Sequence, residues 1–353
     1  MAYVHNLDPF LLQISGDFGI RWYGLSYLVG FFLAYLLISW MSRRQRAGMT
    51  PQLASEFITY GALGALIGGR LGYCVFYQPD LFLKFKDSFP FWGVLAVNEG
   101  GMASHGGMIG VVVATYLFSK KFGVHIQYLF DLVALASPPG LLMGRIANFI
   151  NGELVGRPAA PDFPLAVKFP QDILSWPHEN FAKLIELSPI VDKVKVSPSQ
   201  WETWLADFSR STEARDQIYS TLHRIIEEIQ NGQDTIREAL APLLTSRHPS
   251  QLYAALSEGL FVFVVLFVFW RKARKPGTVG ALFFVLYACS RILNEFFRLP
   301  DVQIGLTLGI SRGQWLSLGL FLVGLTFLVI WSRSNSLPIP GWGKDPSVGL
   351  GRR

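Results

Sequence analysis

The stretch WYGLSYLVGFFLAYLLISWM, residues 22–41, is an uninterrupted run of mostly apolar residues without a charged side chain. A helix that crosses the hydrocarbon core of a bilayer needs about 20 such residues. The basic cluster RRQR follows at 43–46, and Lys and Arg beside an apolar run are typical of cytoplasmic membrane loops. The stretch therefore predicts a transmembrane helix and, with it, an all-α integral membrane protein.

The composition of the whole chain favours the same class. Only 16% of its 353 residues are charged and 51% are hydrophobic, whereas soluble domains have about 25% charged residues. The net charge of +6 does not indicate a nucleic-acid partner, because the basic residues lie in short clusters beside apolar runs. Cys74 and Cys289 stand alone in apolar stretches, so we expect neither a disulfide framework nor a metal site.

Six further apolar segments bring the number of candidate transmembrane helices to seven. The segments at 105–119 and 127–146 are the least distinct, because hydrophobic periodicity does not separate a short span from a buried helix. The seven predicted spans are 22–41, 54–77, 105–119, 127–146, 251–270, 278–297 and 314–332.

The basic clusters predict how these spans are oriented. RRQR follows span one, KK at 120–121 follows span three, RKARK at 271–275 follows span five, and Arg333 follows span seven. With seven spans, all four clusters lie on the same side. The positive-inside rule then places the N-terminus outside and the C-terminus in the cytoplasm.

The segment between spans four and five has a different composition. It contains 12 of the chain's 25 acidic residues, within 171–247. Apolar residues recur at steps of three and four in 212–244, which predicts amphipathic helices, and Asn231-Gly232 predicts a turn between two of them. The tail, with its Pro and Gly, is expected to be mobile. The predicted parts are a membrane body at 1–157 with spans one to four and outer loop 78–104, an outer head at 158–247, a membrane body at 248–333 with spans five to seven, and a cytoplasmic tail at 334–353.

Polar residues cluster where span four ends, in GRIANFINGELVGR at 144–157. If the helix continues through residue 149, Arg145 and Asn148 share one of its faces. Gly156 permits a tight turn or the close approach of a ligand. The alternative is a helix end that enters solvent, where an arginine extends to the headgroups.

Span six carries a second polar set. Tyr287, Arg291 and Glu295 follow one another at intervals of four residues, so they form one stripe of a helix. Arg291 and Glu295 can pair with each other, but a lone ion pair in lipid rarely recovers its desolvation cost. Ionisable residues at membrane depth usually face a cavity, so the stripe favours a lined cavity.

Further candidates lie at the ends of other spans. His105, in GGMASHGG at 100–107, can act as acid or base, although a lone histidine is more often structural. Tyr23 is by default an interfacial aromatic residue. Several arginines near the outer leaflet, whose planar groups suit phosphate, indicate a phospholipid headgroup as ligand.

These stretches resemble the prolipoprotein diacylglyceryl transferases of bacteria. GRIANFINGELVGR is similar to the signature of that family. RWYGLSYLVGF, GGMASHGG, RHPSQLY at 247–253 and YACSRILNEFFRLPD at 287–301 extend the resemblance in the family's order. It covers nearly the whole chain except much of about 165–245 and the tail. The segment between Gly156 and His248 looks longer than is typical of the family.

The resemblance implies an enzyme with a seven-helix body and a periplasmic head, in the bacterial inner membrane with its active site toward the periplasm. It implies transfer of the diacylglyceryl group of phosphatidylglycerol to the lipobox cysteine of a prolipoprotein, with release of glycerol 1-phosphate and without a cofactor. Arg145 and Arg291 match phosphate-facing arginines, and Asn148, Glu153 and Gly156 match signature residues. Tyr23, His105, Tyr287 and Glu295 match other residues implicated in function.

Among these residues, His105 is the first candidate for the base that activates the thiol, and Tyr23 or Tyr287 come next. Glu153 and Glu295 are expected to orient arginines or bind glycerol hydroxyls. Two alternatives to an enzyme are an anion or lipid transporter, which predicts paired halves with broken helices, and a noncatalytic lipid-binding scaffold, which would not need His105 or the tyrosines.

Overall fold

The structure is a computed structural model that describes residues 2–15, 18–45, 48–87, 89–97, 100–299, 306–307 and 310–343. The chain folds into two compact units, and several helices contribute residues to both of them. The first unit contains Met1–Tyr27, Leu142–Ser257 and Ser290–Leu316, and the second contains Leu28–Leu141, Glu258–Cys289 and Ser317–Arg353.

Each of the seven predicted spans is a helix in the described part of the chain. The helix that corresponds to span five is continuous but contains a π-helical stretch, η7, between its two α-helical parts. The helices are α1 (Trp22–Gln45), α2 (Pro51–Phe76), α3 (Ser104–Phe122), α4 (Ile126–Asn151), α10 (Ser250–Ala254) with η7 (Ala255–Phe261) and α11 (Val262–Phe269), α12 (Thr278–Glu295) and α13 (Arg312–Ser332).

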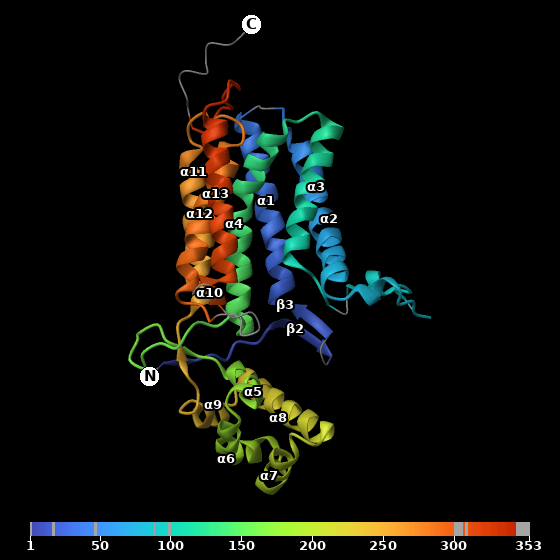
Figure 1. The fold of residues 1–353 in the computed structure, drawn as a ribbon, viewed down its shortest axis with the longest axis vertical. Coiled ribbons are helices and arrows are strands. Elements are labelled where there is room, and N and C mark those ends of the chain that lie inside the picture. Colours follow the sequence, from blue (N-terminus) through green and yellow to red (C-terminus); the bar gives the residue numbers. More distant parts are fainter. Residues whose placement is uncertain are drawn as a thin grey trace. The chain divides into compact units, whose positions relative to one another are not determined.

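Four of these helices, within the described residues, are long and apolar enough to cross a membrane. They are Trp22–Gln45, Ile126–Asn151, Ser250–Phe269 and Gly313–Ser332. Several such helices in one chain make it a multi-pass membrane protein. Within the second unit, Figure 1 shows α4, α11, α12 and α13 running alongside one another, with α2 and α3 as a separate pair.

The core of the second unit joins helices that are far apart in the sequence. Its fully buried side chains include Met41, Tyr128, Leu132 and Trp270. Asp131 in α4 accepts hydrogen bonds from the backbone N–H groups of Gly277 and Gly280, each at 2.7 Å. Gly280 lies in the first turn of α12 and Gly277 directly precedes the helix. Because N–H groups at the start of a helix have no intrahelical acceptors, Asp131 caps α12.

The head region forms its own core within the first unit. The predicted amphipathic helices are confirmed as α8 (Thr212–Gln230) and α9 (Asp234–Leu240), and Gly232 turns the chain between them with a φ of 86°. Figure 1 shows α5 to α9 gathered in one group. The other elements here are η4 (Pro170–Leu174), α5 (Trp176–Glu179), η5 (Phe181–Leu187), α6 (Ser188–Val191), η6 (Asp192–Val194) and α7 (Pro198–Asp207).

Short strands, which the sequence did not predict, accompany the helices but leave the fold mostly helical. One sheet has the order β1-β4-β5, with β1 (Tyr3–Val4) parallel to β4 (Val167–Lys168) and β5 (Ser246–Arg247) antiparallel to β4. Two hairpins complete the set, β2 (Phe10–Ser15) with β3 (Phe18–Arg21) and β6 (Leu306–Thr307) with β7 (Ile310–Ser311).

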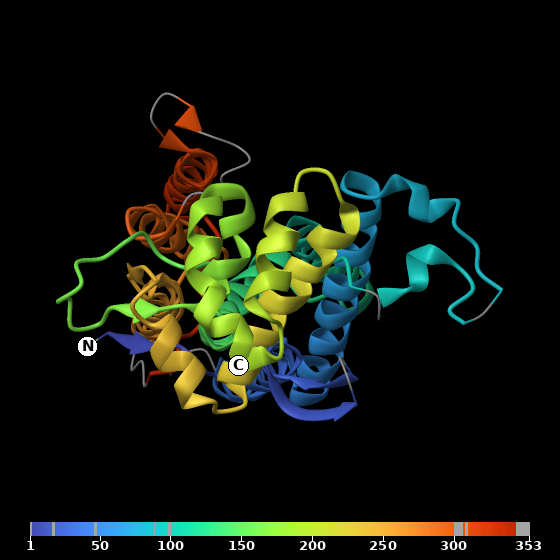
Figure 2. The ribbon, with the colours of Figure 1, turned by 90° about the horizontal axis from the view of Figure 1, so that it is seen from below.

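Residues 78–87 and 89–97, with the short turns η1 (Pro79–Phe82) and η2 (Gly93–Leu95), project sideways from the end of α2 in Figures 1 and 2.

The expectation of a mobile tail is wrong for residues 334–343. Ile339 pairs with Arg274, and the Trp342 indole donates to the carbonyl of Phe267 at 2.7 Å, because apolar side chains outweigh the local Pro and Gly. The remainder, 344–353, lies outside the described residues.

Candidate functional site

The polar stretch after span four forms the end of a helix and a sharply turned loop in the first unit. Helix α4 continues to Asn151, so Arg145 and Asn148 share a face as expected. Gly152 then reverses the chain with a φ of 67°, and the backbone N–H of Glu153 donates to the carbonyl of Asn148 at 3.0 Å. The side chain of Asn148 is buried and donates to the Glu153 carboxylate at 3.5 Å. A carboxylate thus lies over the last turn of the helix.

The loop 153–157 is held on one side by RHPSQLY. The amide of Gln251 donates to the Glu153 carbonyl at 2.6 Å, and the Ser250 hydroxyl donates to the Leu154 carbonyl at 2.9 Å. The guanidinium of Arg247 donates to the Gly156 carbonyl at 3.2 Å. A second bond of Arg247, 2.6 Å to Asp172, orients it. Side chains of one motif therefore bind three backbone carbonyls of the other.

The end of span six holds the same loop on its other side. The backbone N–H of Arg157 donates to the carbonyl of Phe297 at 2.7 Å, and the Arg157 Nε donates to the Arg298 carbonyl at 3.0 Å. Gly156 lies between the two neighbouring segments, and a β-carbon there would overlap the carbonyl of His248 and approach that of Phe297. Only glycine fits this position, because backbone closes it from both sides.

Arg291 and Glu295 in α12 form the ion pair that the sequence left as an alternative. The distance is 2.5 Å, and the side chains are only 14% and 7% exposed. The pair is not isolated, since the Ser311 hydroxyl donates to Glu295 at 3.1 Å and Arg298 lies 3.8 Å from the same carboxylate. Arg157 also donates to the Glu295 carbonyl at 3.4 Å. A buried carboxylate thus orients two arginines beside the signature loop.

The π-helical stretch of span five contributes polar groups that the sequence analysis missed. The amide of Asn294 donates to the Ser257 hydroxyl at 2.8 Å, and the Ser290 hydroxyl donates to the Ser257 carbonyl at 3.2 Å. The adjacent Glu258 is fully buried. Stretches of π-helix often lie at functional sites. A glutamate inside an otherwise apolar run was the available signal.

The remaining predicted residues divide between the two units. Arg145, half-buried in α4, belongs to the first unit, as does Tyr23, whose ring packs edge-on against Tyr27 at 5.3 Å. His105 is the second residue of α3 and is exposed, and Tyr287 stacks on Phe283 at 5.7 Å. Both belong to the second unit.

Arg70 has a structural role that the sequence did not indicate. It is 6% exposed, and its guanidinium donates to the carbonyls of Gly93, Val94, Gly100 and Gly101 at 2.5–3.0 Å. These carbonyls belong to the segment that leads into α3. Arg70 therefore anchors this segment to α2 and is not an anion ligand in this arrangement.

Among the described residues, no group of three or more His, Cys, Asp or Glu side chains is placed to hold a metal ion. The site thus consists of arginines, carboxylates, amides and hydroxyls, a set suited to binding an anion with its polar neighbours.

Comparison with known proteins gives matches over nearly the whole chain. A family model described as prolipoprotein diacylglyceryl transferase matches residues 9–330. A phosphatidylglycerol–prolipoprotein diacylglyceryl transferase of Bdellovibrio bacteriovorus is 59% identical over 351 residues, which cover 99% of this chain and 100% of the relative. Proteins of the same name from Rhodospirillum rubrum and Neisseria gonorrhoeae are 37% and 36% identical, over 95% and 92% of this chain and 96% of each relative.

Proposed function

Because the chain belongs to the prolipoprotein diacylglyceryl transferase family, we propose that it transfers the diacylglyceryl group of phosphatidylglycerol to a prolipoprotein cysteine. The family predicted from the sequence is thereby confirmed. The substrates follow from the names of the relatives, which share 36–59% of their residues with this chain over almost their full length. The product is a thioether, and glycerol 1-phosphate is the leaving group.

We further propose that all seven helices cross the bacterial inner membrane, with the N-terminus and the head at 158–247 on the periplasmic side and residues 334–353 in the cytoplasm. The support for this orientation is the common side of the four basic clusters. The motif residues at the ends of spans four and six then lie at the level of the outer-leaflet headgroups.

The phosphate of phosphatidylglycerol is assigned to Arg145 and Arg291. The thiolate attacks the carbon of the diacylated glycerol that is bonded to the phosphate oxygen. A carbon–sulfur bond forms there, and the bond between this carbon and the phosphate oxygen breaks. Negative charge therefore grows on the phosphate in the transition state. Guanidinium groups held at that oxygen stabilise the charge, and one such donor is worth roughly 3–4 kcal/mol in a low-dielectric site.

The observation that carries the proposed phosphate site is the buried ion pair of Arg291 and Glu295. It lies next to the loop 153–157, which two neighbouring segments hold in place. Glu295 orients Arg291 before the substrate arrives, so little reorganisation is needed during the reaction. Asn148 and Glu153 place polar groups at the end of α4, where glycerol hydroxyls can be bound. Gly156 keeps the loop in place.

His105 is proposed as the base that takes the thiol proton, because an imidazole can accept a proton near neutral pH. Tyr23 and Tyr287 are the next candidates. The thiolate is the nucleophile and belongs to the prolipoprotein, so the chain's own Cys74 and Cys289 are not required.

The proposal is tested by incubating the purified protein with phosphatidylglycerol and a lipobox peptide, followed by mass spectrometry of the peptide. The expected result is a gain of one diacylglyceryl group, and a peptide with serine in place of the cysteine should gain nothing. If the cysteine peptide stays unchanged although a thermal-unfolding transition shows that the protein is folded, the transferase activity is refuted.

A further inference from the structure

Helices α2 and α3 pack against each other through their backbones. Gly64, Gly68 and Gly72 recur at every fourth residue of α2 and face Gly106 and Gly110 of α3, all within the second unit. A β-carbon on Gly68 would overlap the Gly106 carbonyl. Small residues at such intervals let membrane helices approach closely, and the missing side chains leave a hollow along the pair.

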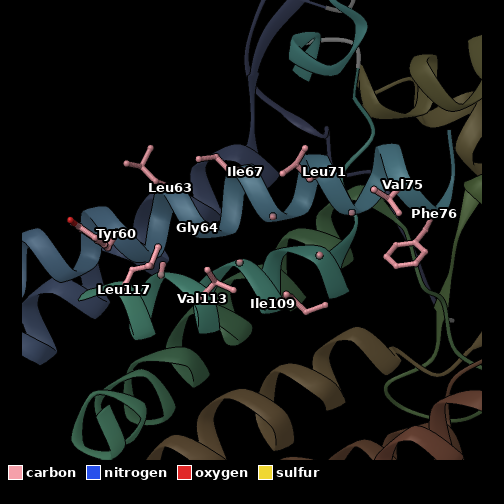
Figure 3. Close-up of a pocket in the computed structure, with 15 residues that line it drawn as sticks. Tyr60, Leu63, Gly64, Ile67, Leu71, Val75, Phe76, Ile109, Val113 and Leu117 are labelled. Atoms are coloured by element: carbon pink, nitrogen blue, oxygen red, sulfur yellow. The ribbon is translucent and has the colours of Figure 1, made fainter. Parts of the chain in front are cut away.

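This hollow is an apolar groove of about 520 Å³, within the range of about 300–1,000 Å³ for ligand pockets. Figure 3 shows one row of side chains from α2 and another from α3 along it. Both rows are open to the outside, since Ile67 is 57% exposed and Val113 is 49% exposed. With the proposed seven-span topology, in which α2 and α3 both cross the membrane, this surface faces lipid.

The length of the groove suits an acyl chain. Its lining extends along α2 from Tyr60 to Phe76, which is roughly 24 Å at a rise of about 1.5 Å per residue. One leaflet contributes about 15 Å, half of the hydrocarbon core. An extended acyl chain therefore fits along the groove from either end.

One end of the groove carries a positive charge. The Nζ of Lys121, at the end of α3, donates to the hydroxyl of Tyr60 at 3.1 Å, and Tyr60 and Leu117 line that end. The ammonium group of Lys121 is exposed, so it can also bind a phosphate. An apolar groove that ends at a cation matches a phospholipid in both its tail and its headgroup.

We propose that this groove binds one acyl chain of a phospholipid whose phosphate is held by Lys121. This lipid is not the reacting one, because Lys121 and His105 lie 16 residues apart on α3, or roughly 24 Å. A second copy of the chain fits the groove less well, since a symmetric pair would bring two sets of Lys120 and Lys121 together.

Native mass spectrometry of the full-length protein in mild detergent tests this binding, with dioleoyl phosphatidylethanolamine as the probe. This lipid has the phosphate but not the glycerol headgroup, and no acceptor peptide is added, so the result does not depend on transferase activity. The wild type should retain one lipid. Val113→Trp, which fills the groove, should lower the retained fraction at least tenfold, and Ile67→Trp should do the same from α2.

The matched controls are neighbouring exposed residues. Val112→Trp places the same ring on α3 beside the groove and should retain the lipid. Lys121→Glu should lower retention and Lys120→Glu should not. Equal retention by the Val113→Trp and Val112→Trp variants, or loss of a dimer rather than of a lipid in Val113→Trp, would overturn the proposal. Unchanged retention in Lys121→Glu would overturn the assignment of the phosphate.

Discussion

The carbonyl oxygen of His248 lies so close to Gly156 that a β-carbon at position 156 would overlap it. Position 156 is therefore closed by a motif about ninety residues further along the chain, and the loop 153–157 is fixed between two other segments. This relationship explains why a glycine is needed in the signature, and it makes the loop sensitive to a single methyl group.

We expect Gly156→Ala to lower the transfer rate at least about 100-fold. The loop must move away from His248, and this movement displaces the side chains that surround the substrate. The rate is measured from the mass gain of a lipobox peptide. Gly319→Ala is the matched control, since Gly319 has open space around its α-carbon within α13 and alanine is favourable there. Equal rates for the two variants would contradict the steric account.

Replacing Arg145 or Arg291 by lysine should lower the transfer rate by about 100- to 1,000-fold, because an ammonium group lacks the planar fork that binds two phosphate oxygens. The comparison of initial rates at saturating phosphatidylglycerol shows whether the loss is in the chemical step. Arg215→Lys, on an exposed face of α8, should leave the rate unchanged. Near-normal rates for both lysine variants would remove the phosphate role.

Arg70→Met should destabilise the segment 93–101 rather than change phosphate binding. The substitution leaves four backbone carbonyls without their donor, and each buried polar group without a partner costs about 1–3 kcal/mol. Hydrogen exchange should accelerate in this segment and at the start of α3. If exchange there stays at the wild-type rate, the anchoring role is wrong.

The stability of the first unit should depend on pH through His5. Its ring is buried between Phe149 and Phe169, and burial lowers the pKa of His5 from 6.5 to about 4. A depressed pKa means that the stabilisation is complete above pH 6.5 and is lost as the pH falls from 6.5 toward 4, by at most about 3 kcal/mol. Thermal unfolding should show this decline, and His5→Phe should flatten it. A parallel decline in both proteins would assign it to other groups.

The seven helices could be predicted to within a few residues, because each apolar run is bounded by charged or turn-forming residues. Helix α2, for example, begins at Pro51 and is capped by Thr50, whose hydroxyl accepts a hydrogen bond from the Leu53 N–H. The amphipathic pattern of α8 was equally direct, since Ile218, Leu222 and Ile225 are all fully buried. Local periodicity carries this information.

Contacts between distant segments could not be predicted in the same way. The sequence marks Gln251 and Arg70 as polar residues, but their partners are backbone carbonyls, which every residue has. The π-helical stretch at 255–261 and the packed residues 334–343 also depend on tertiary contacts. The sequence therefore located the candidate residues, whereas the close contacts of His248 and Phe297 with Gly156 could be found only in the structure.

The most direct test of the central claim uses phosphatidylglycerol with deuterium confined to its terminal headgroup glycerol, together with a lipobox peptide. Tandem mass spectrometry locates the added group, and the released glycerol phosphate is collected. The account predicts an unlabelled diacylglyceryl group on the cysteine sulfur, with all of the deuterium in glycerol phosphate. Deuterium on the peptide, or release of glycerol phosphate without modification of the cysteine, would contradict it.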